Sequence, residues 1–171
     1  NLFSAETGVV TAAMLGGAIE AITVDPTNRA TTTIQAQLAA NNLDQAAVEM
    51  RTMDVPNYLD YAIKHGLTFD TITINPPAFI RGKKRAFTLE QDLPALVAQA
   101  LQVAQNGSQI LVTTTTPTYS MKRLKQAVSD ATQNYTGHVT ASTEFHAPAD
   151  FLQNNADRHS EALRGLLLIV E

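Results

Sequence analysis

Short runs of apolar and β-branched residues alternate along this chain with longer segments whose apolar residues recur at helical spacing. Runs of the first kind predict strands, and they span residues 19–24, 46–51, 69–74, 108–116, 138–145 and 165–170. Segments of the second kind predict helices, over residues 26–40, 56–66, 89–107 and 121–132. This alternation is typical of an α/β domain with a mainly parallel sheet and helices on both faces.

The loops that follow the strands are the expected place for a ligand, because parallel strands end at a common edge of the sheet. These loops span residues 4–8, 25–27, 52–57, 75–79 and 114–120. We therefore look for the chemistry of the protein in these five segments.

Composition narrows the classes of protein that fit this pattern. The chain has 171 residues, enough for one domain, and 44% of them are hydrophobic. Its net charge of −4 gives no overall nucleic-acid signature, so any basic surface must be local. It contains no cysteine, which excludes disulfides and thiolate nucleophiles and fits a reducing compartment. No apolar run approaches the ~20 residues of a membrane span, so we expect a cytoplasmic protein without a membrane partner.

Two aspartates stand directly after predicted strands. Asp25 lies 17 residues beyond Gly8, close to the ~20 expected of an acid that bonds a ribose in a nucleotide-binding βαβ unit. The alternative is that Asp25 only caps a helix that begins at Pro26. Asp54 follows the next strand and could accept a hydrogen bond from an adenine amino group, or be an ordinary loop aspartate.

The first loop argues against a dinucleotide. It offers Gly8 and then Gly16 and Gly17, without the G-x-G-x-x-G spacing that brings a pyrophosphate close to the backbone. A cofactor without phosphates needs less of that approach, so the loop favours S-adenosylmethionine over NAD. An NAD-dependent Rossmann enzyme stays open as a weaker alternative.

The strand over residues 69–74 ends on Asn75-Pro76-Pro77. Neither proline has a backbone N–H to donate, so the sheet cannot continue through them. Asn75 is therefore expected at the end of a strand, with its side chain and the nearby carbonyls outside the hydrogen-bond ladder. The bland alternative is that Asn75 only turns the chain.

These loops together resemble the class I S-adenosylmethionine-dependent methyltransferases of large-subunit ribosomal RNA, which typically carry an N-terminal PUA domain. The family's usual strings read "NLFSYTGGFS", "SVD" and "DPPxFxxSKK", and the resemblance runs from Asn1 to about Thr116. It is carried by "NLFS" at 1–4, Gly8, "LGGA" at 15–18, "TVD" at 23–25, Arg29-Ala30, Asp54 and "FDTITINPPAFIRGKKRAF" at 69–87.

The resemblance implies a Rossmann-like class I methyltransferase fold with an antiparallel C-terminal strand, S-adenosylmethionine as cofactor, and RNA, specifically ribosomal RNA, as partner. It implies that residues 1–171 form the methyltransferase domain, and the opening inside a strand suggests a fragment of a longer chain. A homodimer is kept open as its assembly. The cofactor contacts that it implies are Phe3, Ser4, Gly8, Asp25, Arg29, Asp54 and Asn75.

Two departures from the family pattern bear on activity. Ala5, Glu6 and Thr7 replace Tyr-Thr-Gly, which puts a carboxylate near the cofactor and keeps open a module that has lost catalysis and serves as a scaffold. The absence of cysteine argues against cytosine-C5 methylation, because C5 needs covalent attack at C6 and thiolate is the side chain suited to it. Asn75 and the carbonyl of Pro76 are instead the predicted catalytic pair, which would hold a base nitrogen by accepting from its –NH₂.

A basic string follows the two prolines. Arg81, Lys83, Lys84 and Arg85 could bind RNA phosphates, and Phe79 or Phe87 could stack on an unpaired base. The alternative is a solvated loop with both phenylalanines in the core. The four histidines show no metal-ligand spacing, so no metal site is expected.

Overall fold

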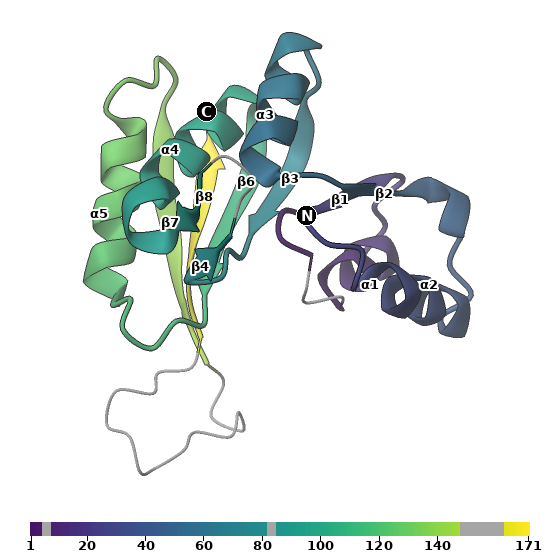
Figure 1. Cartoon of the computed structure of the whole chain (residues 1–171). Coiled ribbons are helices and arrows are strands. Elements are labelled where there is room, and N and C mark those ends of the chain that lie inside the picture. Colours follow the sequence, from purple (N-terminus) through teal and green to yellow (C-terminus); the bar gives the residue numbers. More distant parts are fainter. Residues whose placement is uncertain (5–7, 82–84, 148–162) are drawn as a thin grey trace. The chain divides into compact units, whose positions relative to one another are not determined.

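The computed structural model describes residues 1–4, 8–81, 85–147 and 163–171 (Figure 1). The chain divides into two compact units, Asn1–Tyr58 and Leu59–Glu171, which are described separately below. Helix α3 (Val55–Lys64) crosses the division.

Unit 1 is built around two parallel strands. β1 (Ala21–Asp25) pairs with β2 (Val48–Thr52), in register from Ala21 opposite Val48 to Asp25 opposite Thr52. Helices α1 (Gly8–Leu15) and α2 (Thr31–Ala40) and the short 3₁₀ helix η1 (Gln45–Ala47) complete the unit. The helices pack on the strands through one apolar cluster, formed by Val10, Ala30, Ile34, Leu38 and Val48.

The first residues of the chain pair with β1 on the strand ladder. Leu2 forms a parallel bridge to Val24, the Phe3 N–H donates to the Val24 carbonyl at 2.9 Å, and the Val24 N–H donates to the Asn1 carbonyl at 2.9 Å. Residues 1–4 thus contact β1 through a single bridge at Leu2, and Phe3 leaves the extended conformation with a φ of +64°.

Unit 2 contains a four-stranded sheet in the order β3-β6-β8-β7. Strands β3 (Phe69–Ile74) and β6 (Ala104–Thr114) are parallel, and β8 (Arg164–Val170) runs antiparallel to both β6 and β7 (Val139–His146). β7 carries a register shift between Ala141 and Thr143. Strands β4 (Phe79–Ile80) and β5 (Phe87–Thr88) form a separate antiparallel hairpin.

Two helices cover the sheet of unit 2. α4 (Leu89–Gln102) and α5 (Met121–Thr132) lie beside each other in Figure 1. α4 buries a leucine-rich face, and α5 buries Leu124, Val128 and two alanines. Side chains that are at most 1% exposed form the centre of this core, and they include Leu93, Leu96, Val97, Leu124, Ile110, Val112 and Leu168. The predicted α/β class, with mainly parallel strands and an antiparallel C-terminal strand, is confirmed.

Several predicted boundaries are wrong. The helix predicted from Pro26 begins only at Thr31, because Asp25 and Thr27 close a turn first. The helix predicted over 89–107 ends at Gln102, and residues 104–107 belong to β6, where Gly107 has φ +82°. Helix α1 and the β4–β5 hairpin were not predicted. By contrast, α5 begins where predicted, with the Ser120 hydroxyl accepting from the Arg123 N–H at 3.3 Å.

Among the described residues, no helix combines the length and the apolar character that crossing a membrane requires.

Candidate functional site

In unit 1 the predicted cofactor residues gather where β1 and β2 end. The last pair of the two strands is Asp25 opposite Thr52, and the Met53 N–H donates to the Asp25 carbonyl at 2.9 Å. Phe3 lies on the adjacent N-terminal segment, bonded to Val24. These residues therefore share one edge, as expected of parallel strands.

The Asp25 carboxylate is buried but is not a helix cap. The residue is 7% exposed, and its Oδ1 accepts both the Thr27 N–H at 2.8 Å and the Thr27 hydroxyl at 2.7 Å. Because α2 begins six residues later, the alternative that Asp25 caps a helix at Pro26 is wrong. The two bonds fix the orientation of the carboxylate at the end of β1.

Phe3 adopts a backbone conformation that L residues with large side chains rarely take. Its φ is +64°, although the residue is 4% exposed and aromatic. Such strained residues persist where the surrounding structure holds them, and they concentrate at functional sites. Ser4, which follows it, is also buried, at 3% exposed.

Gly8 leaves open space at the start of α1. It is exposed, and a Cβ built on it would meet no protein atom within 4 Å. Its glycine is therefore not required by the packing of the protein itself. The space would allow an uncharged part of a ligand to come close to the backbone at the start of α1.

The two remaining predicted cofactor residues of unit 1 are exposed. Arg29 lies in the turn before α2, and Asp54 lies between β2 and α3. The Asp54 carboxylate accepts the Asn57 N–H at 3.2 Å, so it caps α3. The loop that contains Ala5, Glu6 and Thr7 lies outside the described residues.

In unit 2 the Asn-Pro-Pro string lies at the end of β3, next to β6. The last β3 residue, Ile74, is opposite Val112, and its carbonyl accepts the Thr113 hydroxyl at 3.5 Å. Asn75 is partly exposed and Pro76 is buried. Within the described part of the chain, no side-chain hydrogen bond engages Asn75. Asn75 therefore lies directly after the end of β3, and its role in binding stays a prediction.

The loop after β6 is held by a buried cation that the sequence analysis did not single out. Arg164, 4% exposed, donates through Nη1 to the carbonyls of Thr116 at 3.1 Å and Tyr119 at 3.0 Å. Burial raises the pKa of the Tyr119 phenol in the same loop. An arginine at the head of the apolar run "RGLLLIV" was the available signal, because arginine is rarely buried without a specific role.

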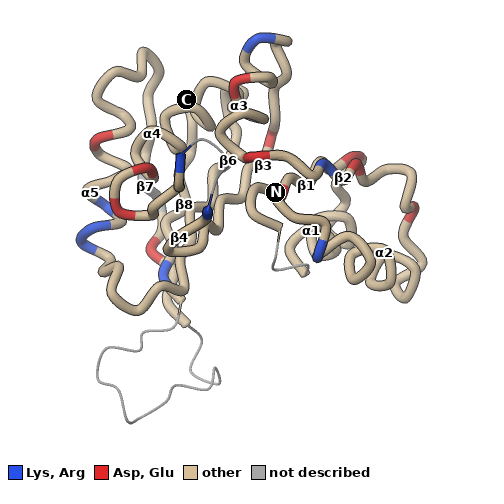
Figure 2. Tube along the Cα trace, in the orientation of Figure 1, with Lys and Arg blue, Asp and Glu red and all other residues tan. Residues whose placement is uncertain are grey.

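The basic string flanks the hairpin that follows the prolines. Arg81 is exposed, and Arg85 forms an ion pair with Asp92 in the first turn of α4. Phe79 is 59% exposed, whereas Phe87 is 8% exposed, so stacking of Phe87 on a base is wrong and only Phe79 stays a candidate. Lys83 and Lys84 lie outside the described residues. Figure 2 shows basic positions both near β4 and at the start of α5.

The described residues contain no group of three or more histidine, cysteine, aspartate or glutamate side chains that could hold a metal ion.

Similarity to solved structures defines the class of fold. The chain matches SMU.776, a candidate methyltransferase complexed with SAH, with a TM-score of 0.90 and 30% identity over 99% of this chain and 44% of that chain. It matches a SAM-dependent methyltransferase of Agrobacterium tumefaciens at a TM-score of 0.74 and 17% identity, over 99% of this chain and 54% of that one. The protein therefore has the Rossmann-like fold of SAM-dependent methyltransferases.

Curated relatives narrow the class. The chain is 33% identical over 168 residues, 98% of its length, to YwbD of Bacillus subtilis, a candidate ribosomal RNA large subunit methyltransferase. It is 24% identical over 150 residues, 88% of its length, to ribosomal RNA large subunit methyltransferase I of Salmonella paratyphi B. It spans 42% and 37% of these two proteins. No protein-family model matches. The chain is thus a homologue of ribosomal RNA large subunit methyltransferases.

Proposed function

We propose that this chain is the catalytic domain of an S-adenosylmethionine-dependent methyltransferase that modifies a base nitrogen of large-subunit ribosomal RNA. The names of its relatives support the RNA substrate, and the 30% identical neighbour complexed with SAH supports the cofactor. The observation that carries the proposal is the position of Asn75, which follows the last residue of β3, precedes two prolines, and makes no side-chain hydrogen bond to the described residues. A PUA domain elsewhere in the protein stays a prediction from the sequence.

The cofactor supplies an electrophilic methyl group, and unit 1 would hold it. The Asp25 carboxylate, oriented by Thr27 through bonds of 2.7 and 2.8 Å, would accept the ribose hydroxyls. Gly8 leaves space for close approach to the backbone. Phe3, Ser4, Arg29 and Asp54 are proposed as further contacts, and Asp54 would have to serve the adenine while capping α3.

Asn75 and Pro76 would position the nitrogen that receives the methyl group. The Asn75 amide oxygen and the Pro76 carbonyl are both acceptors, so together they can bind the two hydrogens of an exocyclic –NH₂. That arrangement directs the nitrogen lone pair away from the acceptors, and alignment alone can supply a large rate factor. Because the sequence has no cysteine, covalent attack by a thiolate at C6 of a pyrimidine is not open to it. Asn75 would also contact the cofactor.

The substitution Asn75→Ala distinguishes a catalytic role of Asn75 from a role in turning the chain alone. In the complete gene product that carries this chain, we expect methyl transfer to unmodified ribosomal RNA to fall by ~10²-fold or more, with cofactor affinity and fold nearly unchanged. The assay is methyl transfer with mass-spectrometric location of the methyl group. Asn57→Ala, which removes an exposed amide in the first turn of α3, is the matched control.

Unchanged turnover in Asn75→Ala would leave Asn75 as a turn residue and contradict the proposal. A methyl group found on cytosine C5 would overturn the chemistry proposed here. Cofactor binding without any transfer to RNA would favour the scaffold module, to which the Ala5-Glu6-Thr7 departure points.

A further inference from the structure

The first turns of α5 carry three of the chain's 12 lysines and arginines, Lys122, Arg123 and Lys125. All three are exposed, on a chain whose net charge is −4. The surface formed by these three side chains is called the α5 basic surface below. The RNA contacts predicted from the sequence all lie in the segment that follows Pro77, so the α5 basic surface is separate from them.

The structure connects the α5 basic surface to the hairpin. Arg123 forms an ion pair with Glu90, and Arg85 forms one with Asp92. Glu90 and Asp92 both lie in the first turn of α4. Arg123 at the start of α5 and Arg85 at the end of the basic string therefore both pair with the first turn of α4. In the sequence, Lys122 lies 37 positions after Arg85.

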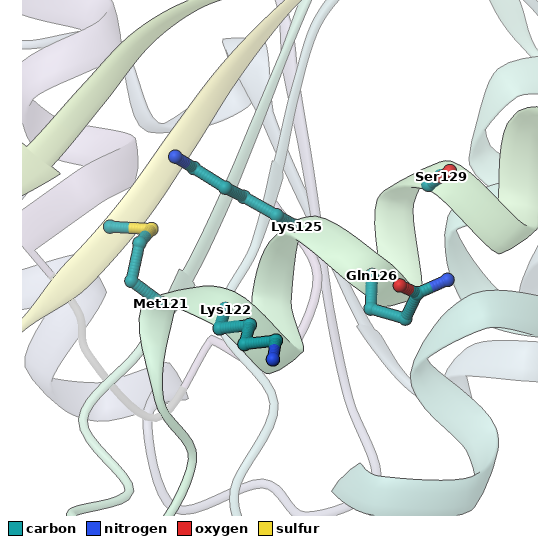
Figure 3. A pocket seen from close by; sticks show the side chains of 5 residues that line it. All are labelled: Met121, Lys122, Lys125, Gln126 and Ser129. Atoms are coloured by element: carbon teal, nitrogen blue, oxygen red, sulfur yellow. The ribbon is translucent and has the colours of Figure 1, made fainter.

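Two of the three cations line a hollow in the surface. Lys122 and Lys125 line it together with Met121, Gln126 and Ser129, and its volume is about 530 Å³. Figure 3 shows that the two lysine side chains project from α5 in different directions. Lysine, glutamine and serine side chains all carry hydrogen-bond donors. A hollow with two ammonium groups and neutral donors fits anionic oxygens that are bound without base specificity.

Ion pairs within this region leave the cations accessible. Arg85, Arg123 and Lys125 side chains are 74%, 56% and 53% exposed, and Lys125 pairs with Glu144. The pairs of Arg123 and Lys125 have both partners exposed and contribute only ~0–1 kcal/mol, so a phosphate can compete for these two cations. The Asp92 side chain, which pairs with Arg85, is only 13% exposed. Across the region, the five cations Arg81, Arg85, Lys122, Arg123 and Lys125 exceed the four carboxylates Glu90, Asp92, Asp130 and Glu144.

We propose that the α5 basic surface binds the phosphate backbone of the RNA substrate and extends the contact made by Arg81 and Arg85. Phosphate contacts position a nucleic acid without reading its sequence. The surface would hold the strand that flanks the target base while Asn75 holds the base. This inference rests on RNA being the substrate, and it is tested by binding rather than by turnover.

The test compares two exposed lysines of unit 2, each on a helix. Lys122→Gln removes one cation from the α5 basic surface, and Lys64→Gln removes one from the end of α3. Affinity of the complete gene product for a fluorescent fragment of large-subunit ribosomal RNA is measured by anisotropy across a salt series. Removing one phosphate contact should lower the slope of log K against log salt by about 0.7–0.9 and weaken binding several-fold. Lys64→Gln should change neither.

Arg123→Gln provides a second variant on the same surface, and thermal unfolding checks that each variant is folded. Equal salt slopes for Lys122→Gln, Arg123→Gln and Lys64→Gln would overturn the α5 basic surface, as would a wild-type protein that does not bind the RNA. A methyl-transfer assay on the wild type judges the proposed function separately. RNA binding that depends on Lys122, without any transfer, would support the surface and reject the catalytic proposal.

Discussion

At the scale of single residues, Asp25 is suited to bind a ligand because hydrogen bonds from Thr27 already orient its carboxylate. Both recorded bonds, from the Thr27 N–H and hydroxyl, reach one oxygen, Oδ1. The carboxylate is therefore fixed in orientation before a ligand arrives, which lowers the entropic cost of binding. Thr27 thus has a positioning role that its exposed place in the loop does not suggest.

Asp25→Asn tests the charge while keeping the turn. The asparagine Oδ1 can still accept from Thr27, so the fold should be retained, while the bonds to a ribose lose their charge. We expect cofactor affinity to weaken by roughly 1.5–3 kcal/mol, measured by calorimetry with SAH. Asp44→Asn is the control, because Asp44 also accepts from a local N–H, that of Ala46 at 2.9 Å, but caps η1. Equal affinities in the two variants would remove Asp25 from the cofactor site.

Gly8→Ala tests the open space at the start of α1. The added methyl group meets no protein atom within 4 Å, and alanine favours helix, so thermal stability should not fall. If the cofactor approaches there, SAH affinity should drop by about 1–3 kcal/mol through overpacking. Calorimetry and a thermal scan on the same sample give both quantities. Unchanged SAH affinity would show that no ligand comes close to Gly8.

At the scale of elements, β8 does more than complete the sheet. Its first residue, Arg164, reaches from the strand to two carbonyls of the loop between β6 and α5, at 3.1 and 3.0 Å. That loop follows the strand adjacent to Asn75. The position of the loop is thus set by a strand that is distant in sequence.

Arg164→Gln should release this loop. The bond to the Tyr119 carbonyl is buried, whereas the Thr116 carbonyl keeps the Tyr119 N–H as a donor. Leaving one buried carbonyl without its donor costs about 1–3 kcal/mol, so the free energy of unfolding should fall by that order in urea titrations. Amide hydrogen exchange over residues 115–120 should also become faster. Arg123→Gln serves as the control, since its exposed pair with Glu90 contributes about 0–1 kcal/mol. Slow exchange retained in Arg164→Gln would mean that other contacts hold the loop.

Periodicity identified most elements but failed where tertiary pairing or turn chemistry overrode local preference. The predicted helix was continued through residues 104–107 up to Gly107. In the structure these residues belong to β6, because Ala104 pairs with Phe69 of β3. Helix α1, "GVVTAAML", has apolar residues on all sides and so lacks the pattern that reveals an amphipathic helix. The start of α2 was misplaced because the Asp25–Thr27 turn precedes it.

Residues of the candidate site were predictable from the sequence only where a residue type stands at a recognisable place relative to a strand. Asn75 was found because two prolines end the strand, and Asp25 because an acid follows a strand at a known spacing. The basic residues of "KRLK" at 122–125 and the arginine at the head of "RGLLLIV" are visible in the sequence, but the partners that give them a role, Glu90 for Arg123 and the loop carbonyls for Arg164, lie far away in the sequence. The exposure of Phe79 and the burial of Phe87 also required the packed structure.

At the scale of the whole molecule, ligand binding should raise the stability of the folded chain. Saturation with SAH at about 100 times its dissociation constant adds ~2.7 kcal/mol. For a chain of 171 residues this corresponds to an increase in Tm of about 5–10 °C. Differential scanning fluorimetry with SAH, and with NAD as the comparison ligand, measures it. A shift with NAD and none with SAH would reverse the choice of cofactor made here.

The register shift in β7 also affects whether two copies of the protein can pair through their sheet edges. Among the described strands β7 pairs only with β8, so its other edge presents backbone donors and acceptors to the surroundings. The irregularity between Ala141 and Thr143 breaks the even spacing of those groups, and Glu144 places a charge on the same strand. Bulges and charges on an edge strand oppose pairing with a neighbouring edge. Concentrated solutions of the protein should for this reason resist sheet-to-sheet aggregation along β7.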